Sequence, residues 1–491
     1  MEPGIRSVPF GRPWEVLSEG ALDAVHGATL AVLERVGLEI GSERILRALA
    51  GTGARVDLEG RRVRFPPEMV EEAIALAPRT FLMAARDPRL DCPVDGTQGY
   101  LSIDGTAAEI LDLQTGARRA PTKRDLEEAT RVADALPEIG FLWPCVAVTD
   151  VPVPLQPLHQ LEAQLANSAK HVQAMSIFSG EDARWAIEMA RTIAGGDQAL
   201  RKRPIISCFQ CSLSPLAYDA GPIEAAVAFA EAGVPSGFVT MAVGTATAPT
   251  TVAGYLTQVN AELLGGIAIV ETLVPGAATF YGPYGAFMDL WSGGLNLAWG
   301  PQETLFELAA AQLAHRYELP LNIGAFGTGA KTSDWHAGVQ NTVSCTAAVL
   351  ACADMICACG TLYGSRVFSY EQLLLDAEMF DLVAGQVEGF PVTQEHLALD
   401  VIEAVGPGGH FLAHDHTRAH MRELWTSQFL GRESWEEWEA AGRPEPRDRA
   451  REKARAILAE HTPLPLDNGV AKELLSIIDA RERELSAPGG G

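Results

Sequence analysis

Long apolar runs and an apolar leader are both missing from this sequence of 491 residues. The best candidate for a membrane-spanning segment is residues 263–274, which are interrupted by Gly265, Gly266 and Glu271. A helix that crosses a bilayer needs roughly 18 or more apolar residues. Residues 1–15 carry prolines and charges where a signal peptide has an apolar segment. We therefore expect a cytoplasmic protein with no membrane association.

Positive charge and cysteine are scarce as well. Lys and Arg number 38 against 63 Asp and Glu, which gives a formal net charge of −25. Such a charge repels phosphate backbones and anionic lipids, so it argues against nucleic acid as a partner and is compatible with plain solubility or with a cationic substrate. The eight cysteines are expected to be reduced thiols. Cys208 and Cys211 have C-x-x-C spacing, but no second pair follows them, so no metal site is predicted there.

No strand-like run leads into a glycine-rich G-x-G-x-x-G turn, which argues against a doubly wound open sheet. Short apolar or β-branched runs instead recur about every 30 to 45 residues, with helical patterns between them, which is the spacing of consecutive βα units. The pattern predicts an α/β fold, namely a (β/α)8 TIM barrel. Seven strands are expected at residues 139–148, 171–178, 205–211, 238–243, 278–284, 321–326 and 355–362. An eighth strand is expected near residues 366–369 or later.

The two ends of the chain differ from this alternating region. Ser18 and Ser42 each precede a helical pattern as N-caps, and residues 56–65 alternate around Glu59-Gly60 as in a hairpin. We therefore expect an N-terminal α+β accessory region at residues 1–120, the barrel at residues 121–405, and a C-terminal helical extension at residues 406–491 that packs on the barrel.

The C-terminal part carries a distinctive series of residues: Gly409-His410-Phe-Leu, His416-Thr417, His420-x-Arg422-x-x-Trp425, Trp435-Glu-x-Trp438, Arg449 and His461-x-Pro463-x-Pro465-Leu466. This series resembles the signature tail of the trimethylamine:corrinoid methyltransferase family. Ile323-Gly-Ala-Phe326 with Lys331-x-x-Asp334, and the segment from Ser369 to Glu378, are similar to the same family. The resemblance covers nearly the whole chain.

The resemblance implies a TIM-barrel transferase that forms homo-oligomers and carries out methyl transfer of the methanogenesis type. The methyl acceptor implied is Co(I) of a corrinoid (cobalamin) held by a separate small corrinoid-binding protein, so this chain itself is not expected to bind a cofactor tightly. Trimethylamine-specific members carry pyrrolysine near the end of the sixth strand, which corresponds to residues 327–334 here. This sequence has only the twenty standard residues, and it therefore resembles the relatives that demethylate a quaternary amine such as glycine betaine.

The chemistry of the substrate supports this division. A quaternary ammonium already carries the positive charge that makes a neutral amine a leaving group, so the protein has mainly to position one methyl group for transfer. Such a cation has no N–H with which to donate a hydrogen bond and is usually held by aromatic faces, each worth roughly 0.5 to 2 kcal/mol. The aromatic residues predicted to lie near the active face are Trp143, Phe209, Tyr281, Tyr284, Phe326 and Trp335.

Polar groups complete the candidate site. His336 and Gln210 are expected to donate hydrogen bonds to the carboxylate of a betaine. Glu371 and Asp376 are expected to complement the cation or to orient neighbouring side chains. Of these residues, Glu371 and His336 are the candidates for a catalytic role. Each also has an ordinary structural explanation, because His336 and Glu371 lie where a helix cap is expected.

Two other interpretations stay open. Lys331 near the end of the sixth strand would serve a Schiff-base lyase or aldolase on the same barrel, and an aromatic cage alone would serve a non-catalytic betaine-binding protein. The pairs His410/His414 and His416/His420 have i,i+4 spacing, but without a convincing set of four ligands we expect no metal.

Overall fold

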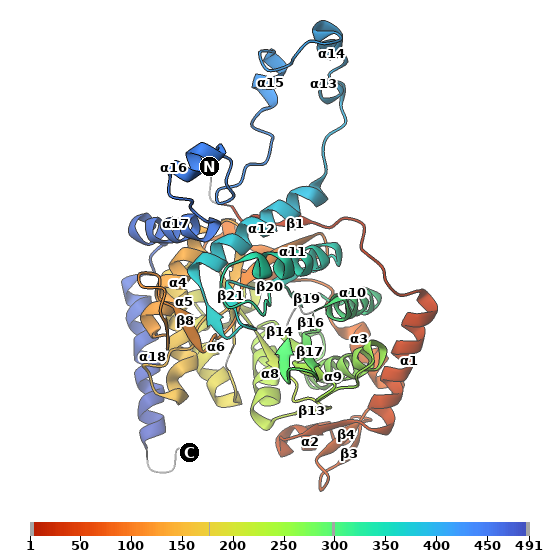
Figure 1. The fold of residues 1–491 in the computed structure, drawn as a ribbon. Coiled ribbons are helices and arrows are strands. Elements are labelled where there is room, and N and C mark those ends of the chain that lie inside the picture. The colour runs from red at the N-terminus through yellow and green to blue at the C-terminus, as the bar shows by residue number, and fades with distance from the viewer. Residues whose placement is uncertain (1–3, 176, 297–299, 488–491) are drawn as a thin grey trace.

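The computed structural model describes residues 4–175, 177–296 and 300–487. Its centre is a barrel of parallel strands surrounded by helices, as Figure 1 shows. The barrel is closed by a parallel bridge between Tyr281 and Leu321. The strands, in chain order, are β7 (Gln98–Ile103), β10 (Ile139–Leu142), β11 (His171–Ala174), β12 (Ile206–Cys211), β14 (Ser236–Val239), β16 (Tyr281–Gly282), β19 (Asn322–Gly324) and β20 (Met355–Cys359).

Each strand is followed by a helix that covers the outside of the barrel, which is the arrangement of a (β/α)8 fold. These helices are α4 (Lys123–Ala135), α5 (Gln156–Asn167), α6 (Gly180–Ala194), α8 (Ala220–Ala232), α9 (Val252–Leu273), α10 (Pro301–Arg316), α11 (Trp335–Leu350) and α12 (Tyr370–Glu388). The short α7 (Asp197–Lys202) follows α6. The predicted TIM barrel is therefore confirmed. Six of its strands fall within the predicted runs, and β14 overlaps the run 238–243 but begins two residues earlier. Residue 176, inside the predicted run 171–178, lies outside the described residues.

The eighth strand is not where the sequence placed it. Residues 98–103 form β7, which pairs in parallel with both β10 and β20 and so completes the barrel. The barrel therefore begins inside the range 1–120 that had been assigned to the accessory region. Val367 and Phe368 form β22 instead, a short strand that pairs with β21 (Thr361–Leu362) and β8 (Glu109–Leu111) outside the barrel. The difference lies in the pairing, because β22 joins no strand of the barrel sheet whereas β7 joins two.

The N-terminal region packs against one side of the barrel. Ser18 caps α1 (Glu19–Arg35) by accepting from the N–H of Ala21, and Ser42 caps α2 (Glu43–Leu49) by accepting from Ile45, as predicted. The predicted hairpin is formed by β3 (Arg55–Asp57) and β4 (Arg62–Arg64). Both α1 and α3 (Pro67–Leu76) contact α9.

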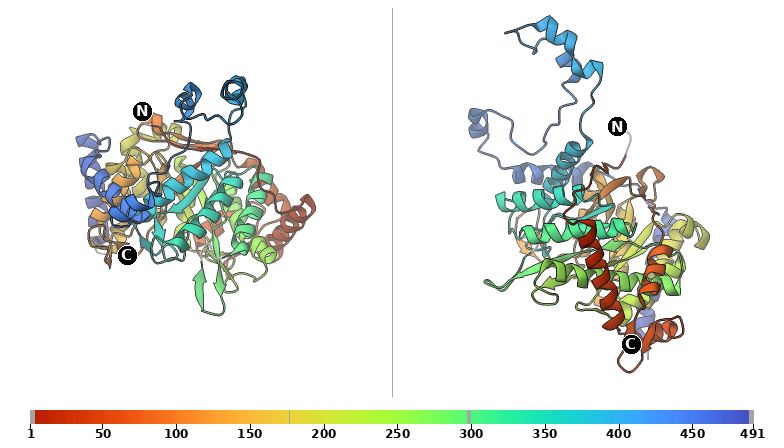
Figure 2. Two further views of the ribbon diagram at one scale, coloured as in Figure 1. Left: turned by 45° about the horizontal axis from the view of Figure 1, so that its top comes forward. Right: turned by 90° about the vertical axis from the view of Figure 1, so that its right-hand side faces the viewer.

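The remaining short elements connect or decorate the barrel. They are β1 (Val8–Pro9), β2 (Leu38–Ile40), β5 (Phe81–Met83), η1 (Pro88–Leu90), β6 (Cys92–Val94), β9 (Arg118–Arg119), η2 (Val153–Leu155), β13 (Ala217–Tyr218), β15 (Ala242–Gly244), β17 (Gly285–Asp289) and β18 (Gly294–Asn296). The antiparallel pair β17–β18 forms a hairpin that projects from the barrel, green at the bottom of the left view in Figure 2.

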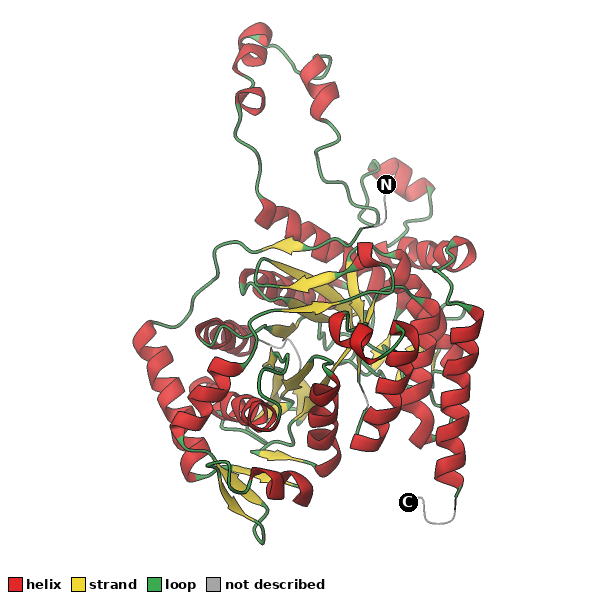
Figure 3. Ribbon diagram, turned by 180° about the vertical axis from the view of Figure 1, so that it is seen from behind, coloured by secondary structure: helices red, strands yellow, loops and turns green. Residues whose placement is uncertain are grey.

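The C-terminal part has two differently placed portions. Helices α17 (Pro446–Glu460) and α18 (Asn468–Ser486) pack on barrel helices, α17 on α12 and α4, and α18 on α5 and α6. Residues 389–426, here called the arm, instead extend away from the barrel, as Figures 1 and 3 show. The arm contains α13 (Gln394–Leu397), α14 (Leu399–Val405) and α15 (Asp415–His420). The chain then returns to the barrel, where Ser427 donates to Glu378 of α12 and Phe429 is buried, and α16 (Trp435–Ala440) follows. Within the described ranges, no helix has both the length and the apolar character required to span a bilayer.

Candidate active site

A cavity of about 310 Å³ lies at the carboxyl ends of the barrel strands, which is the face where TIM-barrel active sites are found. Every barrel strand contributes a lining residue from its last positions or from the loop that follows. In strand order these include Asp104, Trp143, Met175, Phe209, Val239, Tyr284, Gly324 and Ala358. Glu303, Glu307, Gln340 and Ser344 reach the cavity from α10 and α11. The volume suits a small organic substrate, since small-molecule sites enclose roughly 300 to 1,000 Å³.

Three aromatic rings form one wall of the cavity. The ring centroid of Trp143 lies 4.9 Å from that of Phe209 and 6.0 Å from that of Tyr284. The indole N–H of Trp143 donates to Oε1 of Gln173 at 2.6 Å, and the hydroxyl of Tyr284 donates to Oδ1 of Asn322 at 2.7 Å. Because both polar ends are tied to the barrel interior, the rings are held in fixed orientations with apolar surface toward the cavity. We call Trp143, Phe209 and Tyr284 the aromatic wall.

Carboxylates also line the cavity. Desolvation, and then the charge of Glu303 one helical turn away, raise the pKa of Glu307 well above its usual range. Burial raises the pKa of Asp104 too, although Thr361 Oγ1 donates to its carboxylate at 2.6 Å and the N–H of Gly105 at 2.7 Å. None of the described residues that line the cavity is Lys, Arg or His. The cavity is therefore suited to a cation and unsuited to a free anion.

Gln340 supplies the amide side chain among the described residues of the lining. Its Oε1 accepts from the hydroxyl of Thr328 at 2.7 Å and from the N–H of Gly329 at 2.9 Å. With its oxygen so occupied, the amide N–H₂ is the end left for a ligand. Cys211 also lines the cavity, but desolvation raises the pKa of its thiol to about 11, so it stays protonated at neutral pH.

The structure brings only part of the predicted site together. Trp143, Phe209 and Tyr284 line the cavity. Tyr281 is fully buried on the outer side of its strand, where its hydroxyl donates to Asn260 of α9 at 2.9 Å. Gln210 is also buried and, unlike its neighbour Phe209, does not line the cavity. Residues that follow one another on a strand face opposite sides, which explains this division.

The other predicted residues lie elsewhere. Phe326 is fully buried, and its backbone N–H donates to Ser344 at 3.1 Å, so it is a packing residue between the lining positions Ala325 and Gly327. Trp335 is 82% exposed and lines a separate surface hollow with Trp425 and Leu430. Trp335 therefore lies outside the cavity.

The polar candidates are mostly structural. His336 is an exposed residue in the first turn of α11 and does not line the cavity. Glu371 is buried in an ion pair with Arg451 of α17 at 2.7 Å, and accepts from the hydroxyl of Ser369. Asp376 is buried and accepts from the N–H of Gly360 at 2.9 Å. None of these three residues lines the cavity, and Glu371 and Asp376 connect elements of the fold.

Lys331 gives no support to a Schiff-base mechanism. It is exposed, its Nζ donates to the carbonyl of Gly329 at 2.7 Å, and it lies 4.9 Å from the centroid of the Tyr363 ring. It is absent from the residues that line the cavity.

Sequence reasoning missed the carboxylates of the cavity. Glu303 and Glu307 are four residues apart at the start of α10, so they share one face of the helix. Asp104 follows β7 directly, and it would have been found had residues 98–103 been taken as a barrel strand.

The fold and the cavity define the class: this is a (β/α)8-barrel enzyme with its active face at the carboxyl ends of the strands. The family description "Trimethylamine methyltransferase (MTTB)" matches residues 6–486. The chain therefore belongs to the trimethylamine methyltransferase family, and it is a methyltransferase.

Relatives in sequence and structure agree with this assignment. Trimethylamine methyltransferase MttB of Desulfitobacterium hafniense (strain DSM 10664 / DCB-2) is 35% identical over 468 residues, 95% of this chain and 94% of that protein. Glycine betaine methyltransferase of Desulfitobacterium hafniense (strain Y51) is 31% identical, over 96% of this chain and 98% of that protein. The crystal structure of the Methanosarcina barkeri monomethylamine methyltransferase MtmB aligns with a TM-score of 0.50 at 12% identity, covering 92% of this chain and 90% of that one, and shows the same fold.

Proposed function

We propose that this protein transfers a methyl group from a quaternary amine, glycine betaine or a related compound, to Co(I) of a corrinoid carried by a separate protein. The observation that carries the proposal is the composition of the cavity. Aromatic faces and carboxylates surround it, and the lining residues that the structure describes include no cationic side chain. Aromatic faces with nearby carboxylates are the surroundings that a quaternary ammonium prefers.

Within this proposal the protein positions and desolvates the substrate. The aromatic wall packs against the methyl groups of the ammonium, and the pair Glu303 and Glu307 complements its charge from α10. The amide N–H₂ of Gln340 would donate a hydrogen bond to the carboxylate of a betaine. Because the substrate nitrogen is already positive, no residue has to act as a general acid before the methyl group leaves.

The size of the cavity supports an acceptor on a partner. A volume of about 310 Å³ holds a small amine but leaves no room for a corrin ring beside it. The C–N bond that breaks leaves its electron pair on a neutral tertiary amine, and the Co(I) corrinoid, when docked over the barrel mouth, supplies the pair that forms the new bond to the methyl group. One methyl group must then point out of the cavity, which the fixed rings favour.

The two relatives described above are named for different substrates, trimethylamine and glycine betaine. We favour the quaternary substrate, because the chain has only the twenty standard residues near the end of β19, where trimethylamine-specific members of the family place pyrrolysine.

A direct assay tests the proposal. Purified protein is mixed with Co(I) cobalamin and, one at a time, with glycine betaine, other betaines, choline and trimethylamine, and methylcobalamin is followed by its absorbance. We expect one or two quaternary amines to yield methylcobalamin. Comparable turnover of trimethylamine would contradict the quaternary assignment, and no product with any amine, including in the presence of a cognate corrinoid protein, would contradict the reaction.

A further inference from the structure

The arm lacks a hydrophobic core of its own. Among residues 389–426, all of which the structure describes, Val401 is the only buried hydrophobic side chain. Phe390, Leu399 and Leu412 are 84%, 62% and 86% exposed. A small lobe that buries so little apolar surface needs another source of stability, such as a disulfide, a metal ion or a partner chain. No cysteine lies in this segment.

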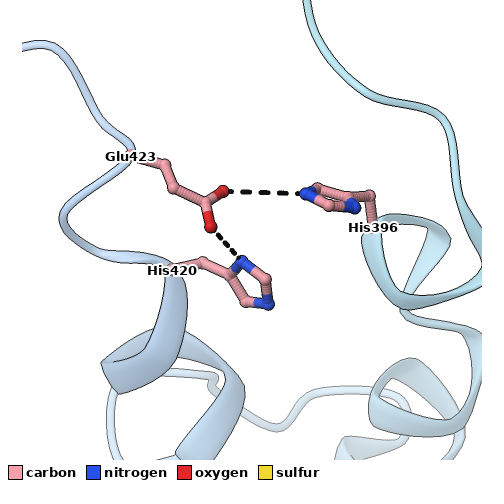
Figure 4. Close-up of side chains that lie close together, drawn as sticks. All are labelled: His396, His420 and Glu423. Atoms are coloured by element: carbon pink, nitrogen blue, oxygen red, sulfur yellow. Dashed lines mark hydrogen bonds and ion pairs between the residues drawn. The ribbon is translucent and has the colours of Figure 1, made fainter.

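The outgoing and returning segments of the arm nevertheless bring together side chains of the kind that bind metal ions. Figure 4 shows His396 on the outgoing side, from α13, opposite His420 and Glu423 on the returning side, from the end of α15 and the residues after it. One nitrogen or oxygen from each of the three residues lies within 4.8 Å of the others. Nε2 of His396 is 3.8 Å from Oε2 of Glu423, and Nδ1 of His420 is 2.6 Å from Oε1. Small side-chain rotations bring such a group onto one ion, since zinc binds nitrogen and oxygen at about 2.0 to 2.2 Å.

Each histidine has an oxygen near its second ring nitrogen, hydrogen-bonded in His396 and at ion-pair distance in His420. Nδ1 of His396 lies 2.7 Å from the hydroxyl of Thr393, so Nε2 is left to accept a metal ion. Nε2 of His420 lies 3.8 Å from the carboxylate of Glu395. A ligand histidine usually donates its second ring N–H to an oxygen, which fixes the ring and raises its basicity.

A third histidine adjoins the group. The ring of His416 lies 4.3 Å from that of His420, one helical turn along α15, and its Nε2 is buried without a hydrogen-bond partner among the described residues. A buried nitrogen with no partner costs stability unless something binds it. This unpartnered nitrogen, on a ring that adjoins His420, is an observation independent of the three clustered side chains.

We propose that His396, His420 and Glu423 bind one zinc ion, with His416 or water in the fourth position, and that this ion holds the two sides of the arm together. Two imidazoles and one carboxylate favour zinc over magnesium or calcium, which prefer oxygen ligands throughout. Glu423 and the nearby Glu395 balance the charge of the ion. This proposal differs from the sequence-based expectation of no metal, which weighed cysteine pairs and the histidines at 410–420 and did not include the ligand that α13 supplies.

Zinc content tests the site directly. The full-length protein is dialysed against a chelator, mixed with a small excess of Zn²⁺, separated from free ion by gel filtration and analysed for metal. We expect one zinc per chain in the wild type, and at least about a hundredfold weaker binding in His396→Ala and His420→Ala, because each removes a ligand. His410→Ala is the matched control, since His410 is an exposed histidine of the same arm outside the group, and it should bind as the wild type does.

Two further measurements separate binding from misfolding. Co²⁺ in place of Zn²⁺ should give the visible absorption bands of a four-coordinate nitrogen and oxygen site in the wild type and in His410→Ala, and not in His396→Ala. Zinc should also slow tryptic cleavage at Arg418 and Arg422 at least about tenfold in the wild type, while the melting temperature of the barrel shows that each variant is folded. A wild type that retains no zinc, or variants His396→Ala and His420→Ala that retain as much as the wild type, would overturn the proposal. Methyl transfer is not the readout, so failure here leaves the proposed function untouched.

Discussion

The aromatic wall makes a quantitative prediction about recognition of charge. Trp143→Phe keeps an aromatic ring between Phe209 and Tyr284 but removes the larger indole face and its hydrogen bond to Gln173. A desolvated cation–π contact is worth roughly 2 kcal/mol with Trp and less with Phe. We take the difference as about 1 kcal/mol, which is about a fivefold increase in Kd.

Calorimetry with two ligands isolates this effect. Choline is compared with its uncharged isostere, in which carbon replaces the quaternary nitrogen. The substitution should weaken choline about fivefold and the isostere much less, because the isostere has the same shape and no charge. Trp335→Ala is the control: this side chain is 82% exposed and outside the cavity, so both affinities should stay at their wild-type values. Equal weakening of the two ligands by Trp143→Phe would refute the cation–π argument and leave Trp143 a shape-determining residue only.

Three other predictions concern charge, stability and partner binding. The raised pKa of Glu307 means that this carboxyl ionises as pH increases, so the affinity for tetramethylammonium should rise with pH, and Glu307→Gln should remove the rise; an identical pH profile in the variant would show that another group is responsible. Burial raises the pKa of Asp376 to about 7, above its usual value near 4 in an unfolded chain, so the stability that its neutral form contributes is complete below about pH 4 and is lost as pH rises through 7. Asp376→Asn should therefore flatten the decline in the free energy of unfolding between these pH values in urea titrations, and an unchanged slope would count against this assignment. Trp291 is 99% exposed on the hairpin that projects beside the cavity, so it is placed to contact a docked corrinoid protein. Trp291→Ala should raise the KM for that protein about tenfold while leaving the KM for the amine unchanged. Leu58→Ala, on the remote β3–β4 hairpin, serves as the control.

The barrel was predictable because its strands are short apolar runs in a regular alternation with helices. That regularity fails at β7, which is separated from α4 by the β8–β9 hairpin and preceded by short strands, so residues 98–103 have no helix immediately after them. Only its pairing with β20, the barrel strand most distant from it in the sequence, identifies β7 as a barrel strand.

The candidate site was predictable to the level of strand ends but not of side-chain direction. Tyr281 and Tyr284 are both near the end of β16, yet Tyr281 points to α9 and Tyr284 into the cavity. Which of two neighbouring residues faces inward depends on the register of the barrel, and that register is set by pairing with other strands. Glu307 was missed for a different reason: it belongs to a helix, and the search for site residues had followed the strands.

The pairing of β7 with β20 also determines when this protein can fold during synthesis. The first strand of the barrel leaves the ribosome early, but one of its two neighbours in the sheet is not made until residue 359. Until then β7 presents an unpaired edge, and edges of this kind are sites of aggregation in incomplete chains. Helices α17 and α18 are made later still and cover α4, α5 and α6, which by then have waited for most of translation. Barrel closure therefore has to wait until β20 is made, and a chaperone that protects the nascent chain would act chiefly on the strands made before it.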